Sequence, residues 1–231
     1  MIGVLVSGEG TNLQALLDAR LPVVAVASNR PGARALERAR AAGVATAAFS
    51  LDEYPDRPTR DGAMAEWLGG SGVELVVLAG YMHLLTRPFL DRFPDRIVNV
   101  HPSLLPAFPG ARAVEEQLAA GVAESGATVH LVDEGIDSGP ILRQERVPVL
   151  TGDTPETLHE RIKEIEHRVL PEVVRELASA SRGVAGGAAP ESTVRRSTGP
   201  EGAVPPAASG GGGAGLRPAG AAAAGEARCA R

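Results

Sequence analysis

The sequence predicts an α/β fold, with an open, mostly parallel, twisted sheet and helices on both of its faces. Three observations predict it. Short apolar or β-branched runs alternate with stretches whose apolar residues recur at helical spacing. Residues 73–80 are almost continuously apolar, as in a central parallel strand that is covered on both faces. A glycine-containing turn, residues 7–12, follows the first run, at the point where such sheets bind ligands.

The strands are predicted from runs of apolar and β-branched residues. They are expected at residues 2–6, 23–27, 45–49, 73–80, 96–101, 125–133 and 140–149. The strand at 96–101 should end at His101, because Pro102 cannot donate to a sheet ladder. Alternation within 125–133 puts His130 on the face opposite Val129, which suits a strand that is covered on one face only.

The helices are predicted from apolar spacing and from capping residues. The first begins near Leu13, with Thr11 or Asn12 as its cap, and the second closes at Gly43. Further helices are expected from about residue 63 through Trp67, over 110–121, and from Thr154 toward 179, where Pro171 should kink or divide the last one. Residues 50–62, which contain two prolines, are expected to be irregular.

Composition limits the classes of function. The chain has 231 residues and a net charge of −5, and its first 181 residues, expected to form one domain, hold 25 acidic and 17 basic residues. An acidic body argues against nonspecific nucleic-acid binding. The single cysteine, Cys229, permits neither an intramolecular disulfide nor a cysteine metal site, which favours a reducing cytoplasm. We expect no signal peptide and no membrane span, since no charged leader or long apolar stretch is present.

The last part of the sequence differs in kind from the rest. From Gly183 onward, 31 of 49 residues are glycine, alanine or proline. Such a segment cannot bury enough apolar surface to offset the entropy lost on ordering. Residues 182–231 are therefore predicted to be a disordered tail, which is a linker, a lineage-specific extension or a reading-frame artefact.

Two segments carry the candidate chemistry. Asn99 and His101 share one face of the strand at 96–101 and lie at its carboxyl end, and Asp137 follows in a loop between Gly135 and Gly139. A carboxamide, an imidazole and a carboxylate held together can orient a proton carrier and donate to developing negative charge. This combination suits acyl transfer without a covalent nucleophile. The alternative is a satisfied polar cluster at the end of a strand.

The turn at 7–12 is a candidate anion site. Its glycines allow backbone N–H groups and the positive end of a helix to face a ligand. It lacks the Lys-Ser/Thr pair of a P-loop, and Leu13 stands where a dinucleotide fingerprint has its third glycine. ATP and NAD are therefore disfavoured, and a tight turn without a ligand is the alternative.

A resemblance to a known family rests on two motifs, Asn99-x-His101-Pro-Ser-Leu-Leu-Pro106 and Asp137-x-Gly139-Pro140. They resemble those of the formyltransferases that use 10-formyltetrahydrofolate. The similarity runs from about residue 2 to about residue 177 and implies a Rossmann-like formyltransferase fold, 10-formyltetrahydrofolate as co-substrate and no metal. The form of residues 102–110 resembles the branch that formylates phosphoribosylglycinamide in de novo purine (IMP) biosynthesis.

The resemblance also implies roles for individual residues. Asn99, His101 and Asp137 would be catalytic. The residues implied to bind phosphoribosylglycinamide are Gly10, Thr11, Asn12 and Glu166. Those implied to contact 10-formyltetrahydrofolate are Arg60, Tyr81, Met82, His83, Leu84, Leu85, Asn99, Val132 and Ile136. For Arg60 the spacing is inexact and a solvated loop arginine competes, while His83 is given no catalytic role and His130 is expected to be structural or solvent-facing.

The implied reaction is direct transfer of a formyl group. The acceptor amine attacks the formyl carbon, and protonated His101 and the Asn99 amide donate to the tetrahedral oxyanion. Asp137 favours the protonated imidazole by its charge and helps to relay a proton from the amine, directly or through water. We expect small-molecule partners, no nucleic acid, no membrane, and a monomer or homodimer.

Three alternatives to this reaction stay open. A formyltetrahydrofolate hydrolase uses the same three side chains with water as acceptor, but its relatives carry an additional N-terminal regulatory domain. A methionyl-tRNA formyltransferase adds a C-terminal RNA-binding barrel, which the sequence after residue 182 is unable to form. A non-catalytic folate-binding module is the third.

Overall fold

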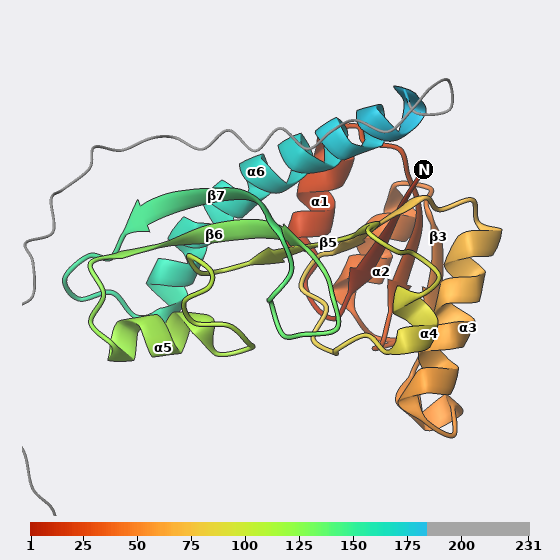
Figure 1. Ribbon diagram of the computed structural model, residues 1–231, viewed down its shortest axis with the longest axis horizontal. Helices are drawn as coiled ribbons and strands as arrows, with labels where there is room; N and C mark the ends of the chain where they lie inside the picture. The colour runs from red at the N-terminus through yellow and green to blue at the C-terminus, as the bar shows by residue number, and fades with distance from the viewer. Residues whose placement is uncertain (184–231) are drawn as a thin grey trace, which may run out of the picture. The chain divides into compact units, whose positions relative to one another are not determined.

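The computed structural model describes residues 1–183, which form a seven-stranded sheet with helices on both faces (Figure 1). The elements follow one another as β1 (Ile2–Val6), α1 (Thr11–Asp18), β2 (Val23–Ser28), α2 (Arg34–Ala41), β3 (Ala45–Ala48), η1 (Leu51–Glu53), α3 (Arg57–Gly70), β4 (Leu75–Leu78), α4 (Arg87–Leu90), β5 (Ile97–His101), α5 (Ala113–Ala119), β6 (Glu124–Leu131), β7 (Ile141–Pro148) and α6 (Pro155–Gly183). The expected tail lies outside the described residues, apart from the two that end α6.

The strand order is β3-β2-β1-β4-β5-β6-β7. The pairs from β3 to β5 are parallel, whereas β6 and β7 pair in the antiparallel sense. The prediction of a mostly parallel sheet is confirmed. The chain runs outward from β1 through β2 to β3 and then returns to β4 on the other side of β1, so β1 and β4 flank the switch point. Ligands bind beyond the carboxyl ends of the strands at such a point.

Two apolar layers sandwich the sheet. One contains the inward faces of α1, α2 and α6 together with Val4, Val77 and Val98. The other is richer in aromatic and long side chains and includes Met64 and Phe89 from α3 and α4. Strands β1 and β4 are buried along their whole length, as their continuous apolar sequences predict. The sheet edge that carries the site is therefore held rigidly from both sides.

The short strand β5 behaves as predicted. It ends at His101, immediately before Pro102. Its neighbour β6 runs antiparallel to it, so that Asn99 lies opposite His130 and His101 lies opposite Thr128. Asn99, His101 and His130 thus occupy one small area at the end of two paired strands.

Helix α3 begins earlier than predicted. The two prolines within residues 50–62 predict irregular structure there, but the helix starts at Arg57. Asp56 caps it by accepting a hydrogen bond from the Thr59 N–H at 2.7 Å. Pro58 is compatible with a first helical turn, where the missing N–H has no intrahelical partner anyway. Arg60 therefore lies on a helix and not in a solvated loop.

One further expectation is wrong, and a second is wrong in part. Strand β6 is buried on both faces, because residues 103–105 of the loop after β5 cover the face that was expected to be open, with Thr128 Oγ1 donating to the Ser103 carbonyl at 2.6 Å. Pro171 does not divide α6, which continues to Gly183. Leu170 and Val173, on either side of the proline, are buried in the core, and their packing stabilises the helix where Pro171 cannot donate a backbone hydrogen bond.

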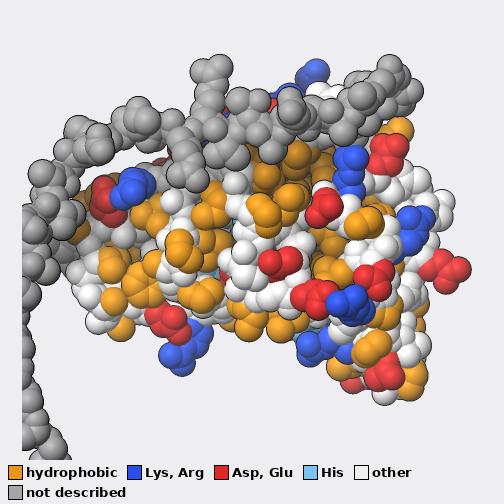
Figure 2. Space-filling view, in the orientation of Figure 1, with side chains coloured by type: hydrophobic (Ala, Val, Ile, Leu, Met, Phe, Trp, Pro, Cys, Tyr) orange, Lys and Arg blue, Asp and Glu red, His pale blue; other side chains and the backbone are white. Residues whose placement is uncertain are grey.

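The surface of this part of the chain is mixed in character. On the face that Figure 2 shows, acidic and basic side chains lie close together around α3 and α4. None of the helices within residues 1–183 is long and apolar enough to cross a membrane.

Candidate active site

A cleft of about 990 Å³ lies at the carboxyl edge of the sheet. The first turn, the loop after β4, the end of β5, the Asp137 loop and the start of α6 all line it. Its volume is at the upper end of the range for pockets that hold a large organic ligand. The segments that the sequence analysis selected as functional therefore meet around one space.

Asp137 is the centre of the polar cluster in this cleft. Its Oδ1 accepts a hydrogen bond from Asn99 Nδ2 at 3.2 Å and lies 3.4 Å from His130 Nε2. Its Oδ2 accepts from the Gly110 N–H at 2.8 Å and lies 3.3 Å from His101 Nδ1. The structure thus brings together the three predicted catalytic side chains and adds His130, which is 2% exposed and so is not solvent-facing.

The environment keeps Asp137 ionised. Burial alone would raise its pKa, but hydrogen bonds from His130 and the Gly110 N–H, together with the charges of His101 and His130, lower the pKa to about 2. The residue has φ 50°, a left-handed conformation that aspartate tolerates better than most residues. Gly139 completes the loop because a side chain there would collide with the Leu131 carbonyl.

His101 is held from both sides of its ring. Nε2 lies 2.8 Å from the Phe108 carbonyl, which can only accept, so this nitrogen carries a hydrogen. Nδ1 faces Asp137. The loop that returns Phe108 to the ring is closed by Ser103 Oγ, which donates to the Ala107 carbonyl at 2.7 Å. The proline-rich segment after β5 therefore works as a clamp on the imidazole.

The Asn99 amide provides the second donor. Its Nδ2 lies 3.1 Å from His130 Nε2, in addition to its bond to Asp137. His130 Nδ1 lies 2.8 Å from the Leu131 carbonyl, which fixes the orientation of that ring. Sequence reasoning missed the contact of His130 with Asp137, although the alternation in β6 already placed His130 away from the apolar face. Two hydrogen-bond donors and one carboxylate thus converge at the cleft, an arrangement able to bind and protonate an oxygen that gains negative charge.

The first turn forms the other wall of the cleft. Gly10 precedes α1 with φ 74°, and a Cβ at this position would lie 2.5 Å from the Ala35 Cβ, so only glycine fits. The expectation that Thr11 or Asn12 caps α1 is wrong, because the cap position is Gly10 and no side chain bonds there. The backbone N–H groups at this helix start remain available to an anion.

Asn12 instead contacts Glu166. Its Nδ2 donates to Glu166 Oε2 at 2.8 Å, which joins α1 to α6 at the bottom of the cleft. Glu166 is only 4% exposed, and burial raises its pKa against the opposing effect of this hydrogen bond. The Oδ1 atom of Asn12 is buried and has no hydrogen-bond partner among residues 1–183. A buried acceptor of this kind is suited to a donor on a ligand.

The residues that the resemblance assigns to the folate side divide into two groups. Those that line the cleft are Tyr81, Met82, His83, Leu84, Leu85, Asn99, Val132 and Ile136. Arg60 does not line it: its side chain is completely buried and forms an ion pair with Asp61. The reading of Arg60 as a solvated loop residue is therefore wrong, because α3 begins early enough to bury it.

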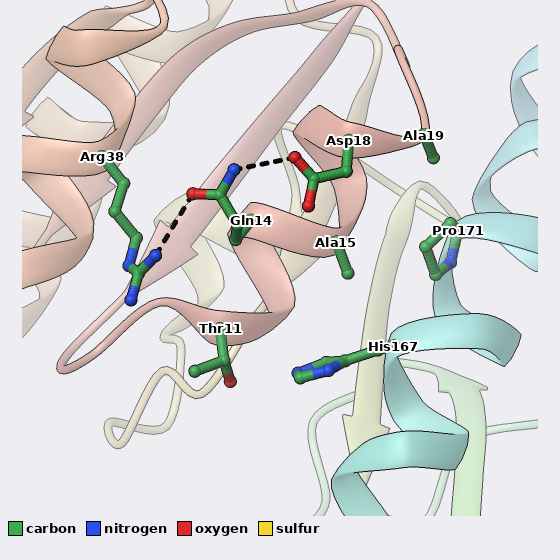
Figure 3. Close-up of a pocket in the computed structure, with 8 residues that line it drawn as sticks. All are labelled: Thr11, Gln14, Ala15, Asp18, Ala19, Arg38, His167 and Pro171. Atoms are coloured by element: carbon green, nitrogen blue, oxygen red, sulfur yellow. Dashed lines mark hydrogen bonds between the residues drawn. The ribbon is translucent and has the colours of Figure 1, made fainter.

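A second, shallower hollow of about 510 Å³ lies between α1 and α6 (Figure 3). There Gln14 accepts a hydrogen bond from Arg38 Nη1 at 3.2 Å and donates to Asp18 Oδ1 at 2.9 Å. His167 projects from α6 toward Thr11 across this hollow. Arg38 and Asp18 are thus linked to each other through Gln14. In the main cleft, by contrast, the polar groups converge on one space. No cluster of three or more His, Cys, Asp or Glu side chains within the described part of the chain could hold a metal ion.

The sheet, its ligand-binding edge and the amide–imidazole–carboxylate cluster define an α/β enzyme of the group-transfer class. The model of the formyl transferase family matches residues 1–174, and the chain belongs to that family.

Individual relatives agree with the family. A phosphoribosylglycinamide formyltransferase from Mycobacterium tuberculosis is 49% identical over 181 residues, which cover 76% of this chain and 84% of that protein. The crystal structure of glycinamide ribonucleotide transformylase 1 from Symbiobacterium toebii has 52% identity and a TM-score of 0.76, and the match covers 78% of this chain and 87% of that one.

Other relatives are much longer. The trifunctional purine biosynthetic protein adenosine-3 from Gallus gallus is 44% identical over 186 residues, and that from Drosophila pseudoobscura pseudoobscura is 43% identical over 188 residues. Each match covers 78% of this chain, but only 18% and 14% of those two proteins.

Proposed function

We propose that this chain transfers the formyl group of 10-formyltetrahydrofolate to the amine of phosphoribosylglycinamide, giving formylglycinamide ribonucleotide and tetrahydrofolate. The observation that carries the proposal is the convergence of Asn99, His101 and Asp137 in one cleft whose opposite wall is the first turn. The names of the Mycobacterium tuberculosis and Symbiobacterium toebii relatives support it.

In the proposed reaction, the amine nitrogen forms a bond to the formyl carbon and the formyl oxygen becomes an oxyanion. Asn99 Nδ2 and a ring N–H of His101 donate to that oxygen, each turning from a partner it has in this structure. The amine then loses a proton to the ionised Asp137, directly or through water. Collapse of the intermediate breaks the bond between the formyl carbon and N10 of the folate, which takes up a proton.

The folate half of the cleft suits a large ring system. Met82, Leu84 and Ile136 keep 66%, 53% and 55% of their surface exposed, although each lines the cleft. Exposed apolar side chains grouped around a pocket are typical of a surface that a ligand covers. No other described residue forms a hydrogen bond with the backbone of Leu84 or Leu85, so these groups can pair with a pterin ring.

The other half suits a phosphorylated acceptor. Gly10 and Asn12 line the cleft, and the first N–H groups of α1 have no acceptor within the helix, so a phosphate in the cleft would be stabilised by the start of α1. Buried Asn12 and Glu166 lie beside them, and their free oxygen atoms can accept from ribose hydroxyl groups. Thr11 also lines this wall.

The test is a spectrophotometric transfer assay with purified phosphoribosylglycinamide as acceptor. We expect tetrahydrofolate to form only when the acceptor is present, and we expect Asn99→Ala, His101→Ala and Asp137→Asn each to lower turnover about tenfold or more, or by at least about 1.4 kcal/mol. Release of formate without the acceptor would support the hydrolase instead. Folate binding without transfer to any amine would support a binding module, and wild-type turnover in all three variants would overturn the assignment of the site.

A further inference from the structure

His83 joins two buried polar groups that belong to other elements. Arg60 Nη1, from α3, lies 2.8 Å from His83 Nδ1. The carboxamide of Asn29, at the end of β2, lies 3.2 Å from His83 Nε2. Arg60 is fully buried and Asn29 is 9% exposed, whereas His83 belongs to the 79–86 loop, which lines the folate half of the cleft. One imidazole therefore bridges α3, β2 and this loop.

The α3 end of the bridge is anchored by Asp61. Its Oδ1 accepts from Arg60 Nε at 2.9 Å and also pairs with Arg60 Nη2. Its Oδ2 accepts from the Thr86 N–H at 2.9 Å and from Thr86 Oγ1 at 2.8 Å. The ion pair thus holds both the ring of His83 and the last residue of the 79–86 loop.

The β2 end of the bridge reaches the first turn. Ser7 directly follows β1, and its Oγ lies 2.6 Å from Asn29 Oδ1. The Met82 N–H donates to the same Oγ at 2.9 Å. The backbone of the 79–86 loop is therefore tied to the segment that leads into the proposed anion site.

The contacts specify one form of the His83 ring. Arg60 can only donate, so Nδ1 must accept and the hydrogen of a neutral ring must be on Nε2. Nε2–H in turn needs an acceptor, and the Asn29 carboxamide supplies one when its oxygen faces the ring. Ser7 Oγ then accepts from both the Asn29 amide and the Met82 N–H. The His83 ring, the Arg60 guanidinium, the Asn29 carboxamide and the Met82 N–H are all paired in this arrangement.

We propose that His83, as a neutral ring hydrogenated on Nε2, is a positioning residue that holds the 79–86 loop and the first turn at a fixed separation for the two substrates. The inference rests on the proposed function, since it concerns how the two halves of that cleft are held. His83 touches neither reacting group in this role and acts through the Met82 backbone and through Asn29.

The surrounding charges make this bridge sensitive to acid. Arg57, Arg60 and Asp61 face the ring from α3, the Tyr81 ring packs edge-on with its centroid 6.0 Å away, and β2 contributes no charge. Desolvation and the two arginines lower the pKa of His83, with Asp61 opposing them. A proton on Nδ1 would point at the Arg60 guanidinium, so protonation breaks the bridge instead of reinforcing it.

The experiment compares His83→Gln with His83→Phe. Glutamine offers an amide oxygen to Arg60 and an amide N–H to Asn29, which reproduces the two contacts, whereas phenylalanine keeps the ring shape and removes both. Hydrogen exchange of the Met82 amide is measured in the free protein, and binding of 10-formyltetrahydrofolate without acceptor is measured by calorimetry. His167→Phe, a ring outside the bridge, is the control.

We expect His83→Phe to speed exchange of the Met82 amide about tenfold and to weaken binding of 10-formyltetrahydrofolate about fivefold. His83→Gln should stay near wild type and should remove the weakening of binding that the wild type shows from about pH 7 to pH 5. Unchanged Met82 exchange in His83→Phe, or faster exchange with unchanged binding, would overturn the proposal. A wild-type protein that does not bind 10-formyltetrahydrofolate would instead overturn the proposed function, and the exchange data would still decide whether the bridge holds the loop.

Discussion

Asp137 and Asp61 each face four hydrogen-bonding groups, yet the two carboxylates are built for different purposes. Asp61 is completely buried and is held by two N–H groups of the Arg60 guanidinium, a backbone N–H and a hydroxyl at 2.5 to 2.9 Å. Asp137 is 13% exposed, and three of its four neighbours are an amide and two imidazoles at 3.2 to 3.4 Å.

The difference shows what separates a fixed carboxylate from one that can react. The partners of Asp61 are an arginine and a threonine, whose guanidinium, backbone N–H and hydroxyl groups keep their protons at ordinary pH. Three of the four contacts of Asp137 are longer, and Asn99 Nδ2 has a second possible partner in His130 Nε2. Small movements can therefore exchange partners around Asp137, whereas around Asp61 they would leave a buried charge unpaired.

Removal of the Asp61 charge is expected to have the largest effect on the free energy of unfolding. Asp61→Asn removes the negative charge from a completely buried pair and leaves the Arg60 guanidinium uncompensated. We expect the free energy of unfolding to fall by about 3–5 kcal/mol, measured by urea denaturation. Asp52→Asn, at an exposed position, is the matched control and should change it by less than about 0.5 kcal/mol. A similar small change in both variants would contradict the fixed role of Asp61.

The pH dependence of stability addresses Asp137. Its pKa is lowered in the folded state from 3.8 to about 2, so its contribution is fully present above about pH 4 and is lost as the pH falls toward 2. The loss amounts to about 2 kcal/mol. We expect the wild type to lose about 1.5 kcal/mol more stability than Asp137→Asn between about pH 5 and pH 2.5, in parallel urea titrations, because the rest of the loss falls below pH 2.5. Equal losses in the two proteins would show that the carboxylate is not stabilised by its neighbours.

A smaller change tests how tightly Asp61 is held. Thr86→Val keeps the shape of the side chain and the backbone N–H but removes the hydroxyl that donates to Asp61 Oδ2. We expect a loss of about 1.5 kcal/mol, the value typical of a hydrogen bond to a charged group, measured by urea denaturation. Thr151→Val, at an exposed turn residue, provides the baseline. No difference between them would mean that the backbone N–H alone satisfies that oxygen.

Local patterns in the sequence predicted the structural features that depend only on residues close together in the chain. The alternation in residues 96–101 and the proline after His101 correctly placed Asn99 and His101 together at a strand end. The apolar runs correctly identified the buried strands β1 and β4. These features arise from side-chain alternation and burial within a few residues, which sequence reveals directly.

Contacts that depend on tertiary register were not predicted. His130 meets Asp137 because β6 pairs antiparallel with β5 so that residue 130 lies opposite Asn99, and a single residue of slip would reverse its face. The Arg60–Asp61 pair is buried because α3 begins at Arg57, a start for which Asp56 and Pro58 were an available but unused signal. The spacing of residues in the sequence therefore did not reveal the contact of His130 with Asp137 or the buried Arg60–Asp61 pair.

A substitution of His130 is expected to have the smallest effect, and it tests whether Asp137 depends on this neighbour. His130→Phe keeps a buried ring of similar shape and removes the nitrogen beside Asp137 Oδ1, so the desolvated carboxylate loses one of the interactions that oppose burial. We expect its pKa to rise, followed by the carboxyl carbon shift in a ¹³C titration, and turnover to fall about tenfold, or about 1.4 kcal/mol. An unchanged titration with reduced turnover would mean that His130 acts through Asn99, because Asn99 Nδ2 contacts both groups. If neither the pKa nor turnover changes, the other three neighbours are enough to keep Asp137 ionised and active. Asp137 would then be held as firmly as Asp61, in spite of its longer contacts.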